Sequence, residues 1–139
     1  MPRFVISIRG EKLTLVSIAV CVRNGKDWIN GCMESLVNQT HKTTEIILVD
    51  DGSTDGGREI VKKWASHDNV ITILQEAKGL SSGRMAALEI AKGDWFAITD
   101  IDVRPEANWI ESLLDSSVSR EGENVVAVTG RTVFGRSDD

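Results

Sequence analysis

Two pairs of acidic residues are the strongest sign of chemistry in this 139-residue sequence. Asp50 and Asp51 follow the apolar run 46–49, and Asp100 and Asp102 follow a second apolar run. Neighbouring carboxylates repel one another and resist desolvation, so folding alone gains nothing by crowding them at the end of a buried strand. Such clusters suit a cation, a hydroxyl-rich ligand or a base. The alternative for the first pair is a turn that caps the next helix, as Asp, Ser and Thr often do.

The spacing of Asp100 and Asp102 favours a metal site. In an extended segment residues i and i+2 point the same way, so both carboxylates are predicted to face one side. They form an oxygen-rich partial site for Mg²⁺ or Mn²⁺, which keep several waters and take further ligands from substrate phosphates. For Asp102 alone, the alternative is that it stabilises a helix N-terminus. That alternative loses weight beside a second acidic cluster at the same rim.

Arg84 is the candidate for contacting an anionic ligand. It follows Gly79 on a predicted helix, and the small residues 81–83 beside it allow a ligand to approach closely. A guanidinium there suits a phosphate or the carbonyls of a base. The alternative is an ordinary surface arginine. Lys78 and Arg104 are weaker candidates for reaching a diphosphate.

The elements that must position these residues alternate between strands and helices. Residues 1–12 are predicted to be an N-terminal arm or edge strand, 13–135 one domain, and 136–139 a tail. The predicted strands are 13–22, 45–49, 70–74, 95–99 and 125–129. The predicted helices cover 27–37, 60–65, 80–91 and 109–118. This order predicts an α/β fold with a parallel sheet and helices on its faces, which brings Asn24 and both acidic pairs to one edge of the sheet.

Composition narrows the function classes. Hydrophobic residues make up 41% and charged residues 27% of the chain, as in soluble globular proteins. The net charge of -5 argues against a nucleic-acid surface built on bulk positive charge. No apolar run approaches the ~18 residues of a membrane span. Cys21 and Cys32 are interpreted as buried hydrophobes in a reducing compartment, and the four Trp as core residues. The expected location is the cytoplasm, with peripheral membrane association left open.

Several stretches together resemble glycosyltransferase family 2, whose members are inverting enzymes with the A-type nucleotide-sugar-binding fold (GT-A, Rossmann-like). The resemblance covers about residues 14–135. It rests on residues 16–24, 34–40, 45–55, 78–84 and 93–102 with Pro105 and Trp109.

The resemblance implies a role for each site residue. Asp51 matches the acid that contacts the base, and residues around Val22 match the strand end lining the base pocket. Arg84 matches the arginine near the nucleotide. Asp102 matches the metal ligand of the DxD motif, and Asp100 lies nearer the ribose. The implied nucleotide-binding residues are Val22, Asn24, Asp50, Asp51, Arg84 and Asp100, and the implied metal ligands are Asp102 and Asp100.

The implied activity is that of a metal-dependent hexosyltransferase of polysaccharide biosynthesis. The implied cofactor is Mn²⁺ or Mg²⁺, which neutralises the leaving diphosphate. The implied donor is a UDP- or GDP-sugar, and the acceptor is a saccharide, a lipid-linked molecule or a protein. Cys21 to Arg23 replace the proline and aromatic residue common in the family, and Met85 replaces an asparagine. These departures leave the base preference open.

The family's general base is expected beyond the last predicted strand, so no catalytic residue is identified. The chain is therefore expected to be the donor-binding half, truncated before the acceptor-binding half. One alternative is a nucleotide-sugar-binding module without the base. A more distant one is a phosphatase of the haloacid dehalogenase class, with Asp100 as nucleophile. That motif, however, belongs on the first strand of its fold.

Overall fold

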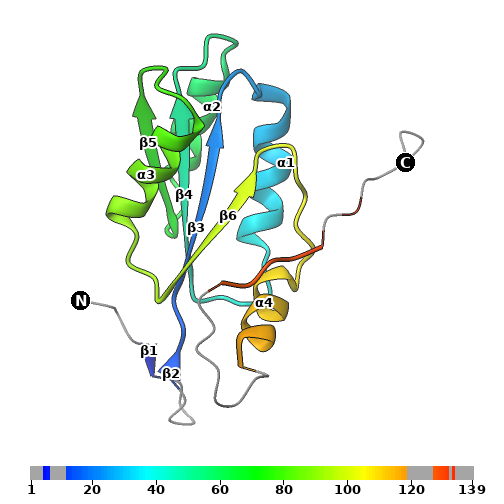
Figure 1. Cartoon of the computed structure of the whole chain (residues 1–139). Helices are drawn as coiled ribbons and strands as arrows, with labels where there is room; N and C mark the ends of the chain where they lie inside the picture. The colour runs from blue at the N-terminus through cyan, green and yellow to red at the C-terminus, as the bar shows by residue number, and fades with distance from the viewer. Residues whose placement is uncertain (1–4, 7–11, 119–126, 132, 134–139) are drawn as a thin grey trace.

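A parallel four-stranded sheet forms the centre of the computed structural model, which describes residues 5–6, 12–118, 127–131 and 133 (Figure 1). The sheet order is β5-β4-β3-β6, and every neighbouring pair is parallel. Its strands are β3 (Val16–Val22), β4 (Thr44–Asp51), β5 (Val70–Gln75) and β6 (Trp95–Asp100). The predicted α/β class with a parallel sheet is confirmed.

The two central strands are buried on both faces, which explains their continuous Val, Ile and Leu runs. Even-numbered residues of β3 and β4 pack into one apolar cluster and odd-numbered residues into a second cluster. The register pairs Cys21 with Asp100 and Val22 with Asp50. The carboxyl ends of β3, β4 and β6 therefore meet at one edge.

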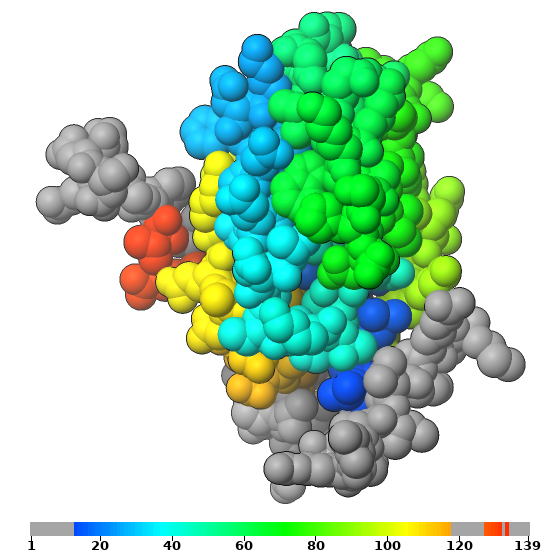
Figure 2. Space-filling view, turned by 180° about the vertical axis from the view of Figure 1, so that it is seen from behind, coloured from blue at the N-terminus to red at the C-terminus, as the bar shows by residue number. Residues whose placement is uncertain are grey.

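Helices cover both faces of the sheet. On one face lie α1 (Lys26–Val37), α2 (Gly57–Trp64) and α4 (Trp109–Val118), which contribute to the larger cluster. Figure 2 shows α1 and α2 side by side on that face. The other face carries α3 (Leu80–Ile90), whose Ala87 packs with Ala19, Ile47 and Val49. The prediction of helices on both faces is confirmed.

The beginning of the chain differs from the prediction. The predicted strand 13–22 is interrupted, and the strand of the main sheet begins only at Val16. The preceding residues form a separate hairpin in which β1 (Val5–Ile6) pairs antiparallel with β2 (Lys12–Leu13). The apolar run could not show this break, because β2 and β3 both contribute apolar residues to it.

The predicted fifth strand, 125–129, is wrong where it can be compared. Residues 125 and 126 lie outside the described residues, and 127–129 have no strand pairing. Residues 127–130 instead border an apolar cavity of about 360 Å³ together with Trp95 and Trp109. Residues 127–130 therefore lie beside β6 and α4 without strand pairing.

Candidate functional site

β4 runs two residues further than predicted, and this separates the roles of its two terminal acids. Because Asp50 and Asp51 lie within the strand, their side chains point to opposite faces of the sheet. Asp50 points to the face covered by α2, and Asp51 to the face covered by α3. The prediction that both acids lie in a turn after the strand is wrong, because the β4–β5 pairing continues through Asp50 and Asp51.

Asp50 forms a buried ion pair. Its carboxylate is 0% exposed, and Oδ2 accepts hydrogen bonds from Arg58 Nε at 2.7 Å and from the Ser53 amide at 3.3 Å. Arg58 also donates from Nη2 to the Gln75 carbonyl at the end of β5. Within the described residues, Asp50 Oδ1 is buried without a hydrogen-bond partner. Asp50 thus joins β4 to α2 and, through Arg58, to β5. Its contact with a nucleotide stays a prediction.

Asp51 anchors the loop between β5 and α3. Oδ1 accepts hydrogen bonds from the Lys78 amide at 2.8 Å and from Gln75 Nε2 at 2.7 Å, and Oδ2 accepts one from the Gly79 amide at 2.9 Å. The Lys78 amide, more than any other group, lowers the pKa of Asp51 below its usual value. Desolvation raises this pKa, whereas the hydrogen bonds from Gln75 and Gly79 lower it further. Asp51 is therefore an ionised acceptor at neutral pH.

Gly52, the next residue, is required by this loop. Its φ is +77°, and a Cβ there would lie 2.7 Å from the backbone nitrogen of Ala77. A side chain at this position would therefore meet both backbone strain and a close backbone contact. The glycine lets the β5–α3 loop approach the end of β4, where Asp51 binds it.

Asn24 and Asp55 join the loops after β3 and β4. Asn24 adopts a left-handed conformation with φ of 53°, and its Oδ1 accepts a hydrogen bond from the Thr54 amide at 2.7 Å. Asp55 accepts from the Lys26 amide at 2.9 Å and from the Gly57 amide at 2.8 Å, at the first residues of α1 and α2. The bond from Lys26, followed by that from Gly57, lowers the pKa of Asp55. Asp55 therefore binds the first amide of both helices, as a predicted helix cap would, although the N-cap positions themselves are Gly25 and Gly56.

Val22 ends β3 beside these loops. Its side chain is only 2% exposed and packs in the larger core cluster. The side chain therefore serves the core, and the rim of the site receives only its backbone. That this strand end lines a base pocket stays a prediction.

Arg84 and Asp100 meet on the face covered by α3. Arg84 Nη2 lies 3.1 Å from Asp100 Oδ1, and the two side chains are 36% and 62% exposed. Cys21 lies between Asp100 and Asp51. Burial raises the pKa of the Cys21 thiol to about 11. Arg84 lowers this pKa by a smaller amount, and Asp51 and Asp100 raise it further. A Cβ on Gly83 would lie 2.9 Å from Cys21 Sγ, so α3 packs tightly at this point. The structure thus brings Arg84 to Asp100, whereas Asp50 lies on the opposite face of the sheet, paired with Arg58.

Asp102 is exposed but does not continue the strand. β6 ends at Asp100, and the Val103 amide donates to the Asp100 carbonyl at 3.1 Å, which closes a turn. The prediction that Asp100 and Asp102 face one side of an extended segment is therefore wrong, because the chain turns between them. In the part of the chain that the structure describes, no three His, Cys, Asp or Glu side chains are grouped as a complete metal site. Any cation here would need ligands beyond this pair.

The comparisons with known proteins identify the family. The sequence model of the Glycosyl transferase family 2 matches residues 17–138. The chain belongs to this family. Its relatives include the glycosyltransferase GlyG of Streptococcus pneumoniae, which is 34% identical over 114 residues. These residues are 81% of this chain and 38% of GlyG.

Solved structures of similar fold confirm the GT-A architecture. The mannosyltransferase PcManGT from Pyrobaculum calidifontis, in complex with GDP-Man and Mn²⁺, has a TM-score of 0.69 and 24% identity, over 75% of this chain and 32% of PcManGT. TarS 1–349 of S. aureus in complex with UDP-GlcNAc has a TM-score of 0.62 and 27% identity, over 73% of this chain and 30% of that chain. The family 2 chain therefore spans less than two fifths of the length of each of these proteins.

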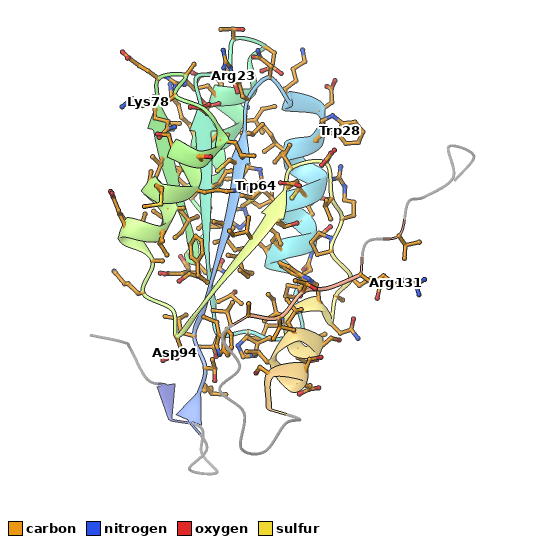
Figure 3. The ribbon with its side chains drawn as sticks, viewed as in Figure 1. Arg23, Trp28, Trp64, Lys78, Asp94 and Arg131 are labelled. Atoms are coloured by element: carbon orange, nitrogen blue, oxygen red, sulfur yellow. The ribbon has the colours of Figure 1, made fainter. Side chains whose placement is uncertain are left out.

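Sequence reasoning missed two residues of the candidate site. Arg58 looked like any polar position on α2, because no spacing in the sequence links it to Asp50. Trp28 was predicted to be a core residue, but it is 50% exposed, and Arg104 Cζ lies 5.8 Å from the centroid of its ring. Figure 3 shows Trp28, Arg23 and Lys78 toward the end of the molecule where the strands finish, and Asp94 at the other end.

The remaining predictions concern the surroundings of the site. No helix among the described residues has the length and apolar character needed to cross a membrane. Trp64 is buried at 9% exposure, Trp95 and Trp109 are half-buried, and Cys32 is fully buried, as predicted. The family match argues against the phosphatase alternative. The acidic motif that suggested it lies at the end of β6, the last strand of the sheet in chain order, and not on a first strand.

Proposed function

We propose that this chain is the donor-binding part of a metal-dependent, inverting glycosyltransferase that uses a nucleotide-diphosphate sugar. The observation that carries the proposal is the contact between Arg84 of α3 and Asp100 of β6, 3.1 Å apart, at the strand edge that also carries Asp51 and Asp102. A cationic group and carboxylates at one edge suit a diphosphate and its counter-ion.

The donor set fits a hard divalent cation. Asp100 and Asp102 both present exposed carboxylates, and Mg²⁺ and Mn²⁺ take oxygen ligands. Two carboxylates are too few for an all-protein cage, but they suit an ion that keeps waters and shares the substrate's phosphates. When bound, such an ion supplies Lewis-acid stabilisation of the departing diphosphate. The complex of PcManGT with GDP-Man and Mn²⁺ supports this choice.

Asp51 would recognise the base. Its pKa is lowered, so it is an anionic acceptor. Each carboxylate oxygen has two acceptor positions, and Oδ2 receives one bond, from Gly79. This leaves capacity for an N–H of uracil or guanine. Because Asp51 also fixes the Lys78 and Gly79 amides, base recognition and the placement of α3 depend on one carboxylate.

For the donor and the acceptor we propose only the chemical class. The complexes of PcManGT with GDP-Man and of TarS with UDP-GlcNAc support a GDP- or UDP-sugar. The acceptor hydroxyl would belong to a saccharide, a lipid-linked molecule or a protein. Its deprotonation would require a general base outside the candidate site. We propose a cytoplasmic location, and peripheral membrane association of the whole enzyme stays an expectation.

Isothermal titration calorimetry tests the proposal. UDP and GDP are titrated into the folded chain, with and without Mn²⁺. We expect one of the two to bind, and to bind more weakly when EDTA replaces the cation. A folded chain that binds neither nucleotide with Mn²⁺ present would contradict the proposal. Nucleotide binding that does not respond to the cation would contradict its metal-dependent part.

A further inference from the structure

Arg104 follows β6 and lies against α1 at a position where only a glycine leaves room for its guanidinium. A Cβ on Gly31 would lie 2.5 Å from Arg104 Nε and Nη2 and 2.6 Å from Cζ. The same guanidinium lies over the ring of Trp28, at 5.8 Å from the centroid, in a cation–π arrangement. Trp28 and Gly31 are three residues apart on α1 and therefore neighbours on its surface. Together they form a seat for Arg104.

The seated guanidinium is connected to the turn that carries Asp102. Arg104 Nη1 donates to the carbonyl of Ile101 at 3.4 Å and to the carbonyl of Val103 at 3.2 Å. These carbonyls belong to the residues on either side of Asp102. Arg104 therefore links the backbone around Asp102 to the surface of α1.

A second contact joins the start of this turn to α1. The Asp100 carbonyl accepts a hydrogen bond from the Val103 amide at 3.1 Å and a weaker one from Cys32 Sγ at 3.7 Å. Cys32 adjoins Gly31 in α1 and is fully buried. The helix thus contacts the turn at two points, one before Asp102 and one after it.

We propose that Gly31, Trp28 and Arg104 are positioning residues that orient Asp102 toward the divalent cation of the donor site. The inference rests on the proposed function, because the cation belongs to that site. Arg104 acts through the turn and is not a metal ligand, since its guanidinium carries a positive charge and has no acceptor. The seat explains why α1 keeps a glycine in its interior, where glycine lowers helix stability.

Gly31→Ala is the most specific test, because the new methyl group displaces the Arg104 guanidinium without destabilising the helix. Alanine has the higher helix propensity, and the atoms it would meet are the end of a flexible side chain. An open groove of about 430 Å³ beside Gly31, Glu34 and Arg104 gives the displaced guanidinium room to move. We therefore expect the variant to unfold at no lower temperature than the parent.

The expected loss is confined to cation-dependent binding. With Mn²⁺ present, the affinity of Gly31→Ala for the nucleotide that the parent binds should fall by about fivefold or more, as for the loss of an anchoring hydrogen bond. Its affinity for the corresponding nucleoside, without metal, should not change. The emission of Trp28, obtained by difference against a Trp28→Phe background, should shift without any ligand, because the cation leaves the ring.

A double-mutant cycle shows whether Gly31 acts through Arg104. Gly31→Ala combined with Arg104→Ala should bind the metal-nucleotide complex no more weakly than Arg104→Ala alone. Equal Mn²⁺-dependent affinity of Gly31→Ala and the parent overturns the inference, and so do fully additive losses. If the parent itself binds no nucleotide with Mn²⁺, the proposed function fails as well, so the two failures are distinguishable.

Discussion

Arg58 Nε lies 2.7 Å from Asp50 Oδ2, and Asp50 is 0% exposed while Arg58 is 34% exposed. The same guanidinium holds the Gln75 carbonyl, and the side chain of Gln75 donates to Asp51 Oδ1 at 2.7 Å. A continuous series of hydrogen bonds therefore runs from α2 to the proposed base-binding carboxylate. The buried pair organises the ends of β4 and β5, on which the site is built.

Loss of Arg58 should destabilise the fold. Arg58→Ala leaves the Asp50 carboxylate buried without its counter-ion, which we expect to lower the free energy of unfolding by about 2–3 kcal/mol. This is less than for a fully buried pair, because water screens Arg58. Urea unfolding measures the change. Lys62→Ala is the matched control, because it breaks the exposed pair with Glu59 and should cost less than about 1 kcal/mol. Equal costs for the two variants would contradict the role given to Arg58.

Gly52→Ala should be more harmful than Gly56→Ala. Both glycines have positive φ, +77° and +90°, so both substitutions carry backbone strain of about 1 kcal/mol or more. Only at Gly52 does the new Cβ also meet a backbone atom, the Ala77 nitrogen, whereas nothing lies within 4 Å at Gly56. The difference between the two unfolding free energies isolates this contact. If Gly56→Ala cost as much, the close approach of the β5–α3 loop would not be what requires Gly52.

Stability should fall as the pH drops below the ordinary pKa of aspartate. The folded-state pKa values of Asp51 and Asp55 are lowered, chiefly by hydrogen bonds from the amides of Lys78 and Lys26 respectively. Their stabilisation is therefore complete above about pH 4, the unfolded value, and is lost as pH falls through the folded values. Urea unfolding at a series of acidic pH values measures it. Asp55→Asn should be less stable at neutral pH and should lose less stability on acidification. If the free energy of unfolding of Asp55→Asn depended on pH as that of the parent does, Asp55 would not contribute to the acid sensitivity.

The sequence predicted the sheet well because its central strands are buried on both faces. Such strands are continuous apolar runs, as 46–49 is, and parallel topology then brings their carboxyl ends together. The helix faces 27–37 and 109–118 were equally readable, since apolar residues recur with helical spacing.

Individual side-chain environments could not be predicted in this way. The apolar run ends before Asp50, although backbone pairing with β5 carries the strand on to Asp51. Trp28 fits the apolar face of α1 by spacing but lies at its edge, where Arg104 covers the ring. The sequence predicts an extended segment through Asp102, because the contact between Cys32 of α1 and the turn after β6 joins residues far apart in the chain. These properties depend on how separate elements pack together, which periodicity does not encode.

The most direct test of the account compares Asp102→Asn with the parent in calorimetric titrations of UDP and GDP. Asp68→Asn is the matched control, because Asp68 is an exposed aspartate that precedes β5, at the opposite edge of the sheet. We predict that Mn²⁺ strengthens nucleotide binding to the parent and to Asp68→Asn, and no longer does so for Asp102→Asn. An Asp102→Asn variant that folds and keeps the full Mn²⁺ effect would contradict the account.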